Sequence, residues 1–414
     1  MTQLEIMGAG AKKAARFLMN AGAKKDEALL AIADALRANA DKIIEANQID
    51  IENGKAAGLT ASLLDRLSLD KSRIDGMADG VTQVAAQPDP IGRILDGRTL
   101  KNGLQIKKVT VPMGVIGIIF EARPNVTSDA AALCLKAGSA VILRGGKEAI
   151  HSNTAIAQIM CNAIEEIGFP RECISLITDT SRQSATELMQ LTEYLDVLIP
   201  RGGAGLIKSV VNNAKVPVIE TGVGNCHVYI DKSADIEMAK NIVFNAKTSR
   251  PSVCNAIETV LVHKDIAPTA LPVIKSELDK KNVEIRGCKQ TKAILGDCVV
   301  PATEDDYAKE FLDYILAVKV VDSLDGALDH IAKYSTGHSE SIVTSDYAAA
   351  ENFTAGVDSA AVYVNASTRF TDGGEFGLGA EIGISTQKLH ARGPMGLGEL
   401  TSSKFIINGN GQIR

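Results

Sequence analysis

The chain has 414 residues, a length at which one hydrophobic core normally gives way to two or three domains. Hydrophobic residues make up 45% of it and charged residues 23%, and the net charge of -6 argues against a nucleic-acid-binding protein, which normally carries a basic face. Because the sequence has neither an N-terminal signal peptide nor an apolar run long enough to span a bilayer, we expect no membrane segment.

The cysteines point to a reducing environment. There are seven of them, an odd number, and their spacing is irregular. No Cys-x-x-Cys pair occurs, and no His and Cys residues stand at zinc-ligand spacing. We therefore predict a cytoplasmic protein with free thiols and no bound metal.

The N-terminal part, from residue 8 to about residue 86, is predicted to be helical. Apolar residues such as Leu29, Ile32 and Leu36 recur there at helical spacing, with charged residues on the opposite face. Two prolines, at positions 88 and 90, then end the helical pattern.

A β-hairpin is predicted next, at residues 97–111. Asn102-Gly103 is a strong signal for a two-residue hairpin turn, and apolar residues flank it on both sides. Because two strands cannot bury a core by themselves, the hairpin must pack on something else. It is either a surface hairpin or an arm that pairs subunits, and the residues favour neither.

Strands and helices alternate from Gly114 onward. The first run has predicted strands at residues 115–120, 140–143, 174–178, 196–199 and 216–220, and predicted helices at residues 130–136 (N-capped by 127–129), 153–167, 181–190 and 204–214. The second run has predicted strands at residues 228–230, 258–262, 315–321, 341–344 and 361–364, and predicted helices at residues 235–247, 266–280, 324–333 and 346–355. An extended tail follows at 401–411. This alternation predicts an α/β fold with two doubly wound, parallel-sheet, Rossmann-like domains.

Cys254 is the first candidate for chemistry. It follows a proline turn, and two cations, Lys247 and Arg250, stand just upstream. Nearby positive charge lowers the pKa of a thiol and raises its thiolate fraction, which makes it a better nucleophile. The alternative is that this cysteine is a small buried hydrophobic residue.

Two glycine turns are candidates for phosphate binding, although no Gly-x-Gly-x-x-Gly follows the first strand. Gly202-Gly203 lies between a strand and a helix, where backbone N–H groups can meet an anion. Arg144-Gly-Gly-Lys147 ends another strand, and its cations suit the 2′-phosphate of NADP(H). A solvated basic turn is the alternative interpretation of the second motif.

Two polar residues at predicted strand ends complete the candidates. Glu220 could act as a general base, or cap a neighbouring backbone segment. Asn125 could donate its amide N–H to an oxyanion, or simply form a turn.

In this order and spacing, with Cys254 34 residues after Glu220, these candidates resemble the aldehyde dehydrogenase superfamily. Three stretches resemble one branch of it, whose members reduce an acyl phosphate: residues 120–127 (FEARPNVT), 321–342 and 390–397 (HARGPMGL). The resemblance covers essentially the whole chain.

The resemblance implies a role for each candidate. Cys254 is expected to be the nucleophile, and Asn125 the oxyanion donor together with the Cys254 backbone N–H. Arg144 stands where relatives have a lysine beside the cofactor ribose, and Lys147 where NAD-preferring relatives carry an acid, which favours NADP(H). Asp313 stands where many relatives have a glutamate on the nicotinamide ribose.

The implied reaction is the NADPH-dependent reduction of L-glutamyl 5-phosphate to L-glutamate 5-semialdehyde in proline biosynthesis, through a cysteine thioester. Glu220 matches a glutamate that activates water in hydrolytic relatives, a step that would waste this thioester. Charge alone nominates the residues that hold the substrate, and each is alternatively a surface ion-pair partner; these residues are Arg123, Lys247, Arg250, His390 and Arg392. The competing functions are an oxidative aldehyde dehydrogenase acting on another small aldehyde, and a non-catalytic binding protein with the same fold.

The same resemblance divides the chain into functional parts. Residues 1–95 and 112–224 are expected to bind the cofactor, and residues 225–372 to carry the nucleophile. Residues 96–111 and 400–414 match oligomerisation elements, so the hairpin is interpreted as an arm and the protein as a homo-oligomer. We expect a glutamate kinase, on another chain, to supply the acyl phosphate.

Overall fold

The computed structural model describes residues 1–414, with the side chain at position 62 excepted. The chain divides into two compact units: one comprises Met1–Thr221, Gly377–Gly383 and Met395–Arg414, and the other comprises Gly222–Phe376 and Ile384–Pro394. Each unit is built on a parallel sheet with helices between its strands, which confirms the predicted α/β class.

Five helices open the first unit, which confirms the predicted helical region, although it begins at Gln3 and not at residue 8. They are α1 (Gln3–Leu18), α2 (Lys24–Ala38), α3 (Ala40–Ala56), α4 (Ala61–Leu67) and α5 (Lys71–Ala86). Three begin at side chains that accept a first-turn N–H: Thr2, Thr60 and Asp70. Leu29 and Ile32 of α2 are fully buried, so the apolar stripe faces the core.

A four-stranded parallel sheet follows, in the order β5-β4-β3-β6. Its strands are β3 (Val115–Phe120), β4 (Ala140–Arg144), β5 (Ile174–Leu176) and β6 (Val197–Arg201), connected by α6 (Asn125–Lys136), α7 (Ile150–Glu166) and α8 (Arg182–Gln190); α9 (Ala204–Asn213) follows β6. Every residue of β3 is buried, as its continuous apolar run predicts. Because parallel strands end at one edge, Arg144 at the end of β4 shares that edge of the sheet with Asn125 and Gly202, which follow β3 and β6.

Two predictions in this region are wrong. Residues 216–220 are not a strand; they make only an isolated bridge between Val218 and Leu198, because Pro217 has no N–H to continue a ladder. The helix predicted at residues 130–136 begins instead at Asn125, directly after Pro124, whose fixed φ suits a helix start. Asn125 therefore lies in the first turn of a helix and not in a preceding loop.

The far end of α6 is held firmly in the first unit. The Lys136 side chain is 1% exposed, and its Nζ lies 2.5 Å from Asp26 Oδ1 and 2.7 Å from the Ala85 carbonyl oxygen. One buried cation thus ties α6 to α2 and α5. A charge buried in this way needs such partners to offset its desolvation.

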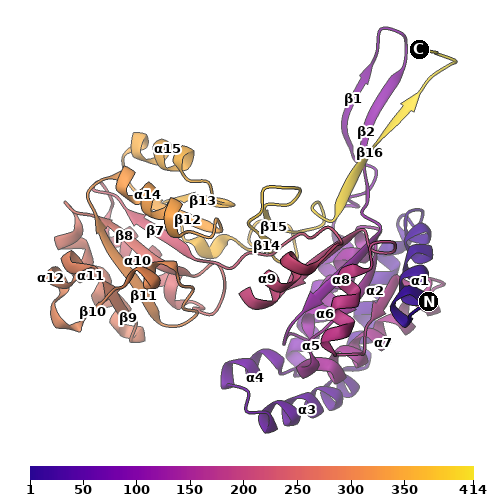
Figure 1. Cartoon of the computed structure of the whole chain (residues 1–414), viewed down its shortest axis with the longest axis horizontal. Helices are drawn as coiled ribbons and strands as arrows, with labels where there is room; N and C mark the ends of the chain where they lie inside the picture. The colour runs from indigo at the N-terminus through magenta and orange to yellow at the C-terminus, as the bar shows by residue number, and fades with distance from the viewer. The chain divides into compact units, whose positions relative to one another are not determined.

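The predicted hairpin and the extended tail form one three-stranded antiparallel sheet, shown as a narrow ribbon in Figure 1. Its order is β1 (Ile94–Thr99), β2 (Gln105–Pro112) and β16 (Thr401–Asn408). The turn is longer than the two residues predicted, because Thr99 pairs with Gln105 and residues 100–104 form the loop. Apolar side chains such as Ile94 (61%) and Phe405 (56%) are exposed on this ribbon.

The second unit has a seven-stranded parallel sheet in the order β10-β9-β11-β8-β7-β12-β13. Its elements are β7 (Cys226–Ile230), α10 (Ile236–Thr248), β8 (Ile257–His263), α11 (Ala267–Leu278), β9 (Glu284–Gly287), α12 (Lys289–Leu295), β10 (Val300–Pro301), α13 (Glu304–Ala308), β11 (Ile315–Val321), α14 (Leu324–Tyr334), β12 (Ser339–Val343), α15 (Tyr347–Gly356) and β13 (Ala361–Val364), with a small β14 (Ile384–Ser385) and β15 (Gly393–Pro394) pair. The short strands β9 and β10 and the helices α12 and α13 were not predicted. They are too short to show a clear hydrophobic period.

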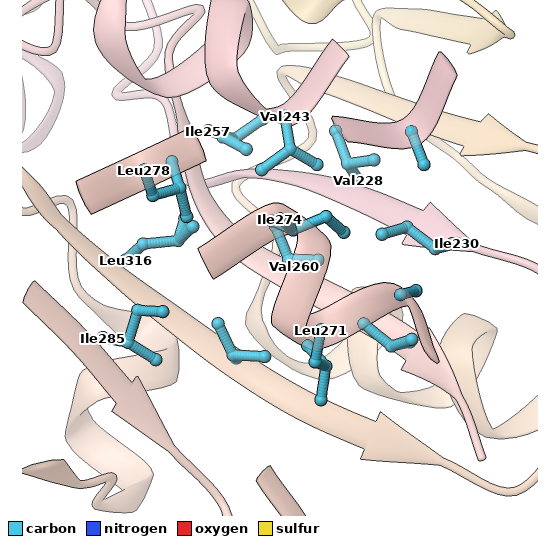
Figure 2. Close-up of a cluster of buried hydrophobic side chains, with 14 of the residues drawn as sticks. Val228, Ile230, Val243, Ile257, Val260, Leu271, Ile274, Leu278, Ile285 and Leu316 are labelled. Carbon is cyan, nitrogen blue, oxygen red and sulfur yellow. The ribbon is translucent and has the colours of Figure 1, made fainter. Parts of the chain in front are cut away.

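Alternate residues of β7 and β8 face opposite sides of this sheet. Val228 and Val260 pack against α10 and α11, in the cluster that Figure 2 shows around Ile274 and Leu271. Tyr229, between two residues of that cluster, points to the other face, where it packs against residues of α14 and α15. Helices thus cover both faces, which is why these strands are buried along their whole length and mostly apolar.

Within the described residues, none of the helices combines the length and the apolar character needed to cross a membrane. The same residues contain no group of three His, Cys, Asp or Glu side chains arranged to hold a metal ion.

Candidate active site

Cys254 lies in the turn that joins α10 to β8 in the second unit. The Ala256 backbone N–H donates to the Val253 carbonyl oxygen at 3.1 Å, which closes the turn around the cysteine. Cys254 is partly exposed, whereas four of the other cysteines are buried: Cys134, Cys161, Cys173 and Cys226. Accessibility to a substrate therefore sets this thiol apart from most of the others.

The Gly224 backbone approaches the Cys254 turn more closely than any side chain would allow. A Cβ atom at Gly224 would lie 1.5 Å from the Cys254 carbonyl oxygen and 2.7 Å from its Cα. The Cys226 thiol donates to the same carbonyl oxygen at 3.2 Å. The turn is thus seated on the backbone just before β7, and glycine is the residue that permits the contact.

Glu310 is a candidate that sequence reasoning missed. Its Oε1 atom accepts a hydrogen bond from the Gly224 N–H at 2.8 Å, across 86 residues of sequence. Asp313, the predicted cofactor residue, instead accepts from the adjacent Tyr314 N–H at 2.7 Å and is exposed. No local spacing links Glu310 to Gly224, so only the folded chain could reveal the contact.

Lys247 does not lie at the surface with Arg250. Its side chain is fully buried, and its Nζ lies 2.6 Å from Oε2 of Glu258, which is buried as well. Burial lowers the pKa of Lys247 and raises that of Glu258 to about 7, against the attraction of the two charges. Its predicted role as a substrate anchor stays a prediction, and this buried pairing weighs against it.

The other predicted anchors of the second unit differ in their surroundings. Arg250 is exposed. Arg392 donates to the carbonyl oxygen and to Oδ1 of Asp358, both at 2.8 Å, so its charge is already paired. His390 has a φ of 68°, a left-handed backbone conformation that residues other than glycine rarely adopt. Such strained residues are often found in functional loops.

In the first unit, Asn125 donates its side-chain N–H to Oδ2 of Asp129 at 2.8 Å. The two residues are one helical turn apart, so the contact follows from α6 beginning at Asn125. Burial raises the pKa of Asp129 to about 6, although the hydrogen bonds from Asn125 and Ser128 and the charge of Arg201 lower it. The predicted oxyanion donor is therefore held by a carboxyl group. Arg123, partly buried, lies just before this helix.

Arg144 is anchored at the end of β4. Its Nη2 donates to the carbonyl oxygens of Thr180 and Ser181 at 2.9 and 3.0 Å. Burial lowers the pKa of this arginine. Its Nε is buried and has no hydrogen-bond partner among the described residues, so it is a donor that an oxygen of a bound ligand could satisfy.

Gly203 and Lys147 are brought together around Glu121. Oε2 of Glu121 accepts the Gly203 N–H at 2.9 Å, so a carboxylate already occupies the anion position at the start of α9. Gly202 allows this, because a Cβ atom there would lie 2.4 Å from the same oxygen. Glu121 and exposed Lys147 also line a pocket of about 340 Å³, whose other wall is made by the end of α3, the segment after it and α4.

Glu220 is half-buried at the end of the irregular segment that follows α9. The next residue, Thr221, donates its hydroxyl to the Pro200 carbonyl oxygen at 2.9 Å. The loss of the predicted strand leaves this glutamate on a loop. Its role as a base remains a prediction.

Comparison with known proteins identifies the class. The sequence pattern of the aldehyde dehydrogenase family matches residues 3–296, and the chain belongs to this family. It is 62% identical over 390 residues to the gamma-glutamyl phosphate reductase of Clostridium novyi, covering 94% of this chain and 93% of the relative. It is 58% identical to that of Clostridium botulinum strain Alaska E43, over the full length of both. The crystal structure of the Thermotoga maritima gamma-glutamyl phosphate reductase shares 50% identity and superimposes with a TM-score of 0.97 over the whole of both chains. Within its family, the chain belongs with the gamma-glutamyl phosphate reductases.

Breaking the buried Lys247–Glu258 pair is expected to destabilise the second unit. Lys247→Met leaves a carboxylate without its cation and should cost about 3–5 kcal/mol in the free energy of unfolding. The double variant Lys247→Met/Glu258→Leu should lose less free energy of unfolding, because it leaves no buried charge without a partner. Lys264→Met, which removes one side of the exposed Lys264–Asp322 pair, is the control and should cost less than about 1 kcal/mol. Urea unfolding of the four proteins measures this, and equal effects for both single variants would contradict it.

Asp129→Asn is expected to stabilise the protein at alkaline pH. Because the folded state raises the pKa of Asp129 from 3.8 to about 6, the carboxylate is disfavoured above pH 6 by roughly 3 kcal/mol. The neutral amide avoids this cost and can still accept the Asn125 N–H. The gain should be largest near pH 8, shrink as the pH falls through 6 and vanish near 4. Exposed Asp34→Asn serves as the control in unfolding experiments at these pH values, and a gain independent of pH would refute the charge argument.

Proposed function

We propose that this chain reduces L-glutamyl 5-phosphate to L-glutamate 5-semialdehyde with NADPH and releases phosphate, as a step of proline biosynthesis. The observation that carries the proposal is the full-length identity with gamma-glutamyl phosphate reductases. An accessible cysteine seated on a glycine backbone supports it independently, because acyl transfer needs a positioned nucleophile.

In the proposed reaction, the Cys254 thiolate attacks the acyl carbon, and the oxyanion is stabilised by the Asn125 amide and the Cys254 N–H. A C–S bond forms, the C–O bond to phosphate breaks, and phosphate leaves with the electron pair. NADPH, when bound, supplies the hydride that reduces the thioester. The product of hydride addition is the thiohemiacetal anion on Cys254. As its C=O bond re-forms, the C–S bond breaks, which releases the aldehyde and regenerates the thiolate.

NADP(H) is the proposed cofactor, and the first unit has features that fit it. The unsatisfied Nε of Arg144 and the exposed ammonium of Lys147 can both meet phosphate or ribose oxygens. The 340 Å³ pocket beside Lys147 is within the size range of small-ligand sites. Gly202 and Gly203 remain proposed cofactor contacts, although the Gly203 N–H is already bound by the Glu121 carboxylate. Asp313 remains a proposed contact to the nicotinamide ribose.

Arg123, Arg250 and His390 remain the proposed anchors for the phosphate and α-carboxylate of the substrate. Lys247 and Arg392 are weaker proposals, because each is already paired with an acid. Glu220 is proposed to have a secondary role, since a base that activates water would hydrolyse the thioester.

A cytoplasmic homo-oligomer that receives its substrate from a glutamate kinase completes the proposal. The apolar side chains exposed on the β1–β2–β16 ribbon support its use in subunit pairing. The acyl phosphate is labile in water, which supports supply by a kinase acting nearby. The odd, irregularly spaced set of cysteines supports a reducing compartment.

NADPH oxidation, with a glutamate kinase generating the acyl phosphate in the assay, tests the reaction. Cys254→Ser should reduce the rate at least about a thousandfold. Iodoacetamide should label Cys254 first, and activity should fall in step. Cys288 is the strongest rival thiol, because hydrogen bonds from Thr291 and the backbone outweigh burial and lower its pKa. Activity that survives Cys254 labelling would refute the mechanism. Oxidation of small aldehydes without phosphate would favour the oxidative alternative, and no turnover at all would favour a binding protein.

Lys147→Glu tests the cofactor. If Lys147 contacts the 2′-phosphate, the variant should raise the KM for NADPH roughly tenfold or more while the KM for NADH changes little. Adding Arg144→Ala should increase the difference. Lys289→Glu places the same charge change on an exposed lysine of the second unit and should alter neither value. An equal rise in the KM values for NADPH and NADH would rule out 2′-phosphate recognition.

A further inference from the structure

The residue after the nucleophile, Asn255, is enclosed by a segment 114 residues away. Its side-chain Nδ2 donates to the carbonyl oxygens of Arg369 and Thr371, at 3.3 and 3.0 Å, and its Oδ1 accepts from Arg369 Nη1. Its carbonyl oxygen accepts from the Thr368 hydroxyl at 2.6 Å. Asn255 is only 4% exposed, so this set of bonds satisfies its side-chain amide and its carbonyl oxygen and fixes the backbone on one side of Cys254.

The Arg369 guanidinium also reaches the other side of the turn. Its Nε donates to the Ser249 hydroxyl at 2.9 Å, and Ser249 is the C-cap residue that follows α10. Because the donors of a guanidinium are held in a rigid, planar fork, bonds to Ser249 and Asn255 together fix the span of chain that contains Cys254. A lysine could not make both bonds with the same geometry.

The charge of Arg369 acts at the same place. The guanidinium is half-buried; burial lowers its pKa and Asp372 raises it, and its other charged or ionisable neighbours are Arg250, Cys254 and Glu375. An arginine remains cationic at every pH that a folded enzyme meets. The nearby Cys226 thiol stays neutral, because burial and the charges of Glu340, Cys254 and Glu258 raise its pKa well above the ordinary value.

Lys247, the cation that the sequence places beside the cysteine, is by contrast wholly buried against Glu258. Because the charges of Lys247 and Glu258 offset each other, the pair contributes little electrostatic potential at the Cys254 thiol. Arg250 is exposed and therefore screened by solvent. The half-buried Arg369 combines hydrogen bonds to both ends of the turn with a charge interaction with Cys254.

We propose that Arg369 is the positioning residue for Cys254: its guanidinium holds both ends of the turn that carries the thiol, and its charge favours the thiolate. This inference rests on the proposed role of Cys254 as the nucleophile. It assigns Arg369 no contact with the substrate.

The experiment measures the rate at which iodoacetamide alkylates Cys254, by mass spectrometry across the neutral and alkaline pH range, on the full-length protein without substrate. Arg369→Gln is expected to lower the rate at pH 7 about tenfold and to move the midpoint of the profile up by about one pH unit. Arg369→Lys, which keeps the charge but not the fork, should leave the midpoint near that of the wild type. It should lower kcat for NADPH oxidation and leave the KM for NADPH unchanged.

Arg286→Gln is the matched control, because Arg286 is another half-buried arginine of the second unit and is bound to Asp306 and Glu284. Its alkylation profile should match the wild type. A wild-type profile in Arg369→Gln would overturn the proposal. If Arg369→Gln does not fold, an unchanged kcat in Arg369→Lys would overturn it equally. Failure of the proposed reaction would show separately, as an absence of NADPH oxidation by the wild type.

Discussion

The contact between the Gly224 backbone and the Cys254 carbonyl is the constraint on which the candidate site depends. At this separation any side chain at position 224 would displace the turn, because its Cβ would overlap the carbonyl group. The turn is therefore set by backbone packing against the start of β7, and the Cys226 thiol and Glu310 carboxylate add bonds on either side of that contact. A nucleophile held by backbone is well suited to acyl transfer, where position contributes much of the rate.

The turn is then held from outside by side chains that lie far away in the sequence. Asn255 is bound by the segment from Thr368 to Thr371, and Arg369 extends this hold to the end of α10. The same guanidinium brings a positive charge to a thiol whose upstream lysine is engaged elsewhere. The Arg369 side chain thus links the position of Cys254 to the stability of its thiolate. Lysine at this position keeps the charge but not the planar fork, whereas glutamine removes the charge, so the two replacements separate these effects.

In the first unit, two carboxyl groups are held beside candidate binding residues. Asp129 accepts the Asn125 N–H, and burial raises the pKa of its carboxyl group. Glu121 similarly places a carboxylate on the Gly203 N–H, at a helix start that favours anions. Both acids lie close to groups with proposed roles in binding or catalysis. Each therefore sets the electrostatic field that a ligand would meet.

Local sequence patterns were enough for the α/β class, the two parallel sheets and the candidate cysteine, because hydrophobic runs and glycine turns act over a few residues. They failed where one residue outweighed the pattern: Pro217 prevented a strand at residues 216–220, and Pro124 started α6 at Asn125. The i, i+4 contact between Asn125 and Asp129 would have followed from the correct helix start.

The sequence by itself determined which strands are buried, where the glycine turns lie and which cysteine follows the proline turn. Only the tertiary structure decided the partners of the charged groups: Lys247 with Glu258, Glu310 with Gly224, and Arg369 with Asn255. The physical reason is distance along the chain. Hydrophobic periodicity is a local property, whereas the energy of a buried charge depends on a partner that the fold brings from as far as 114 residues away.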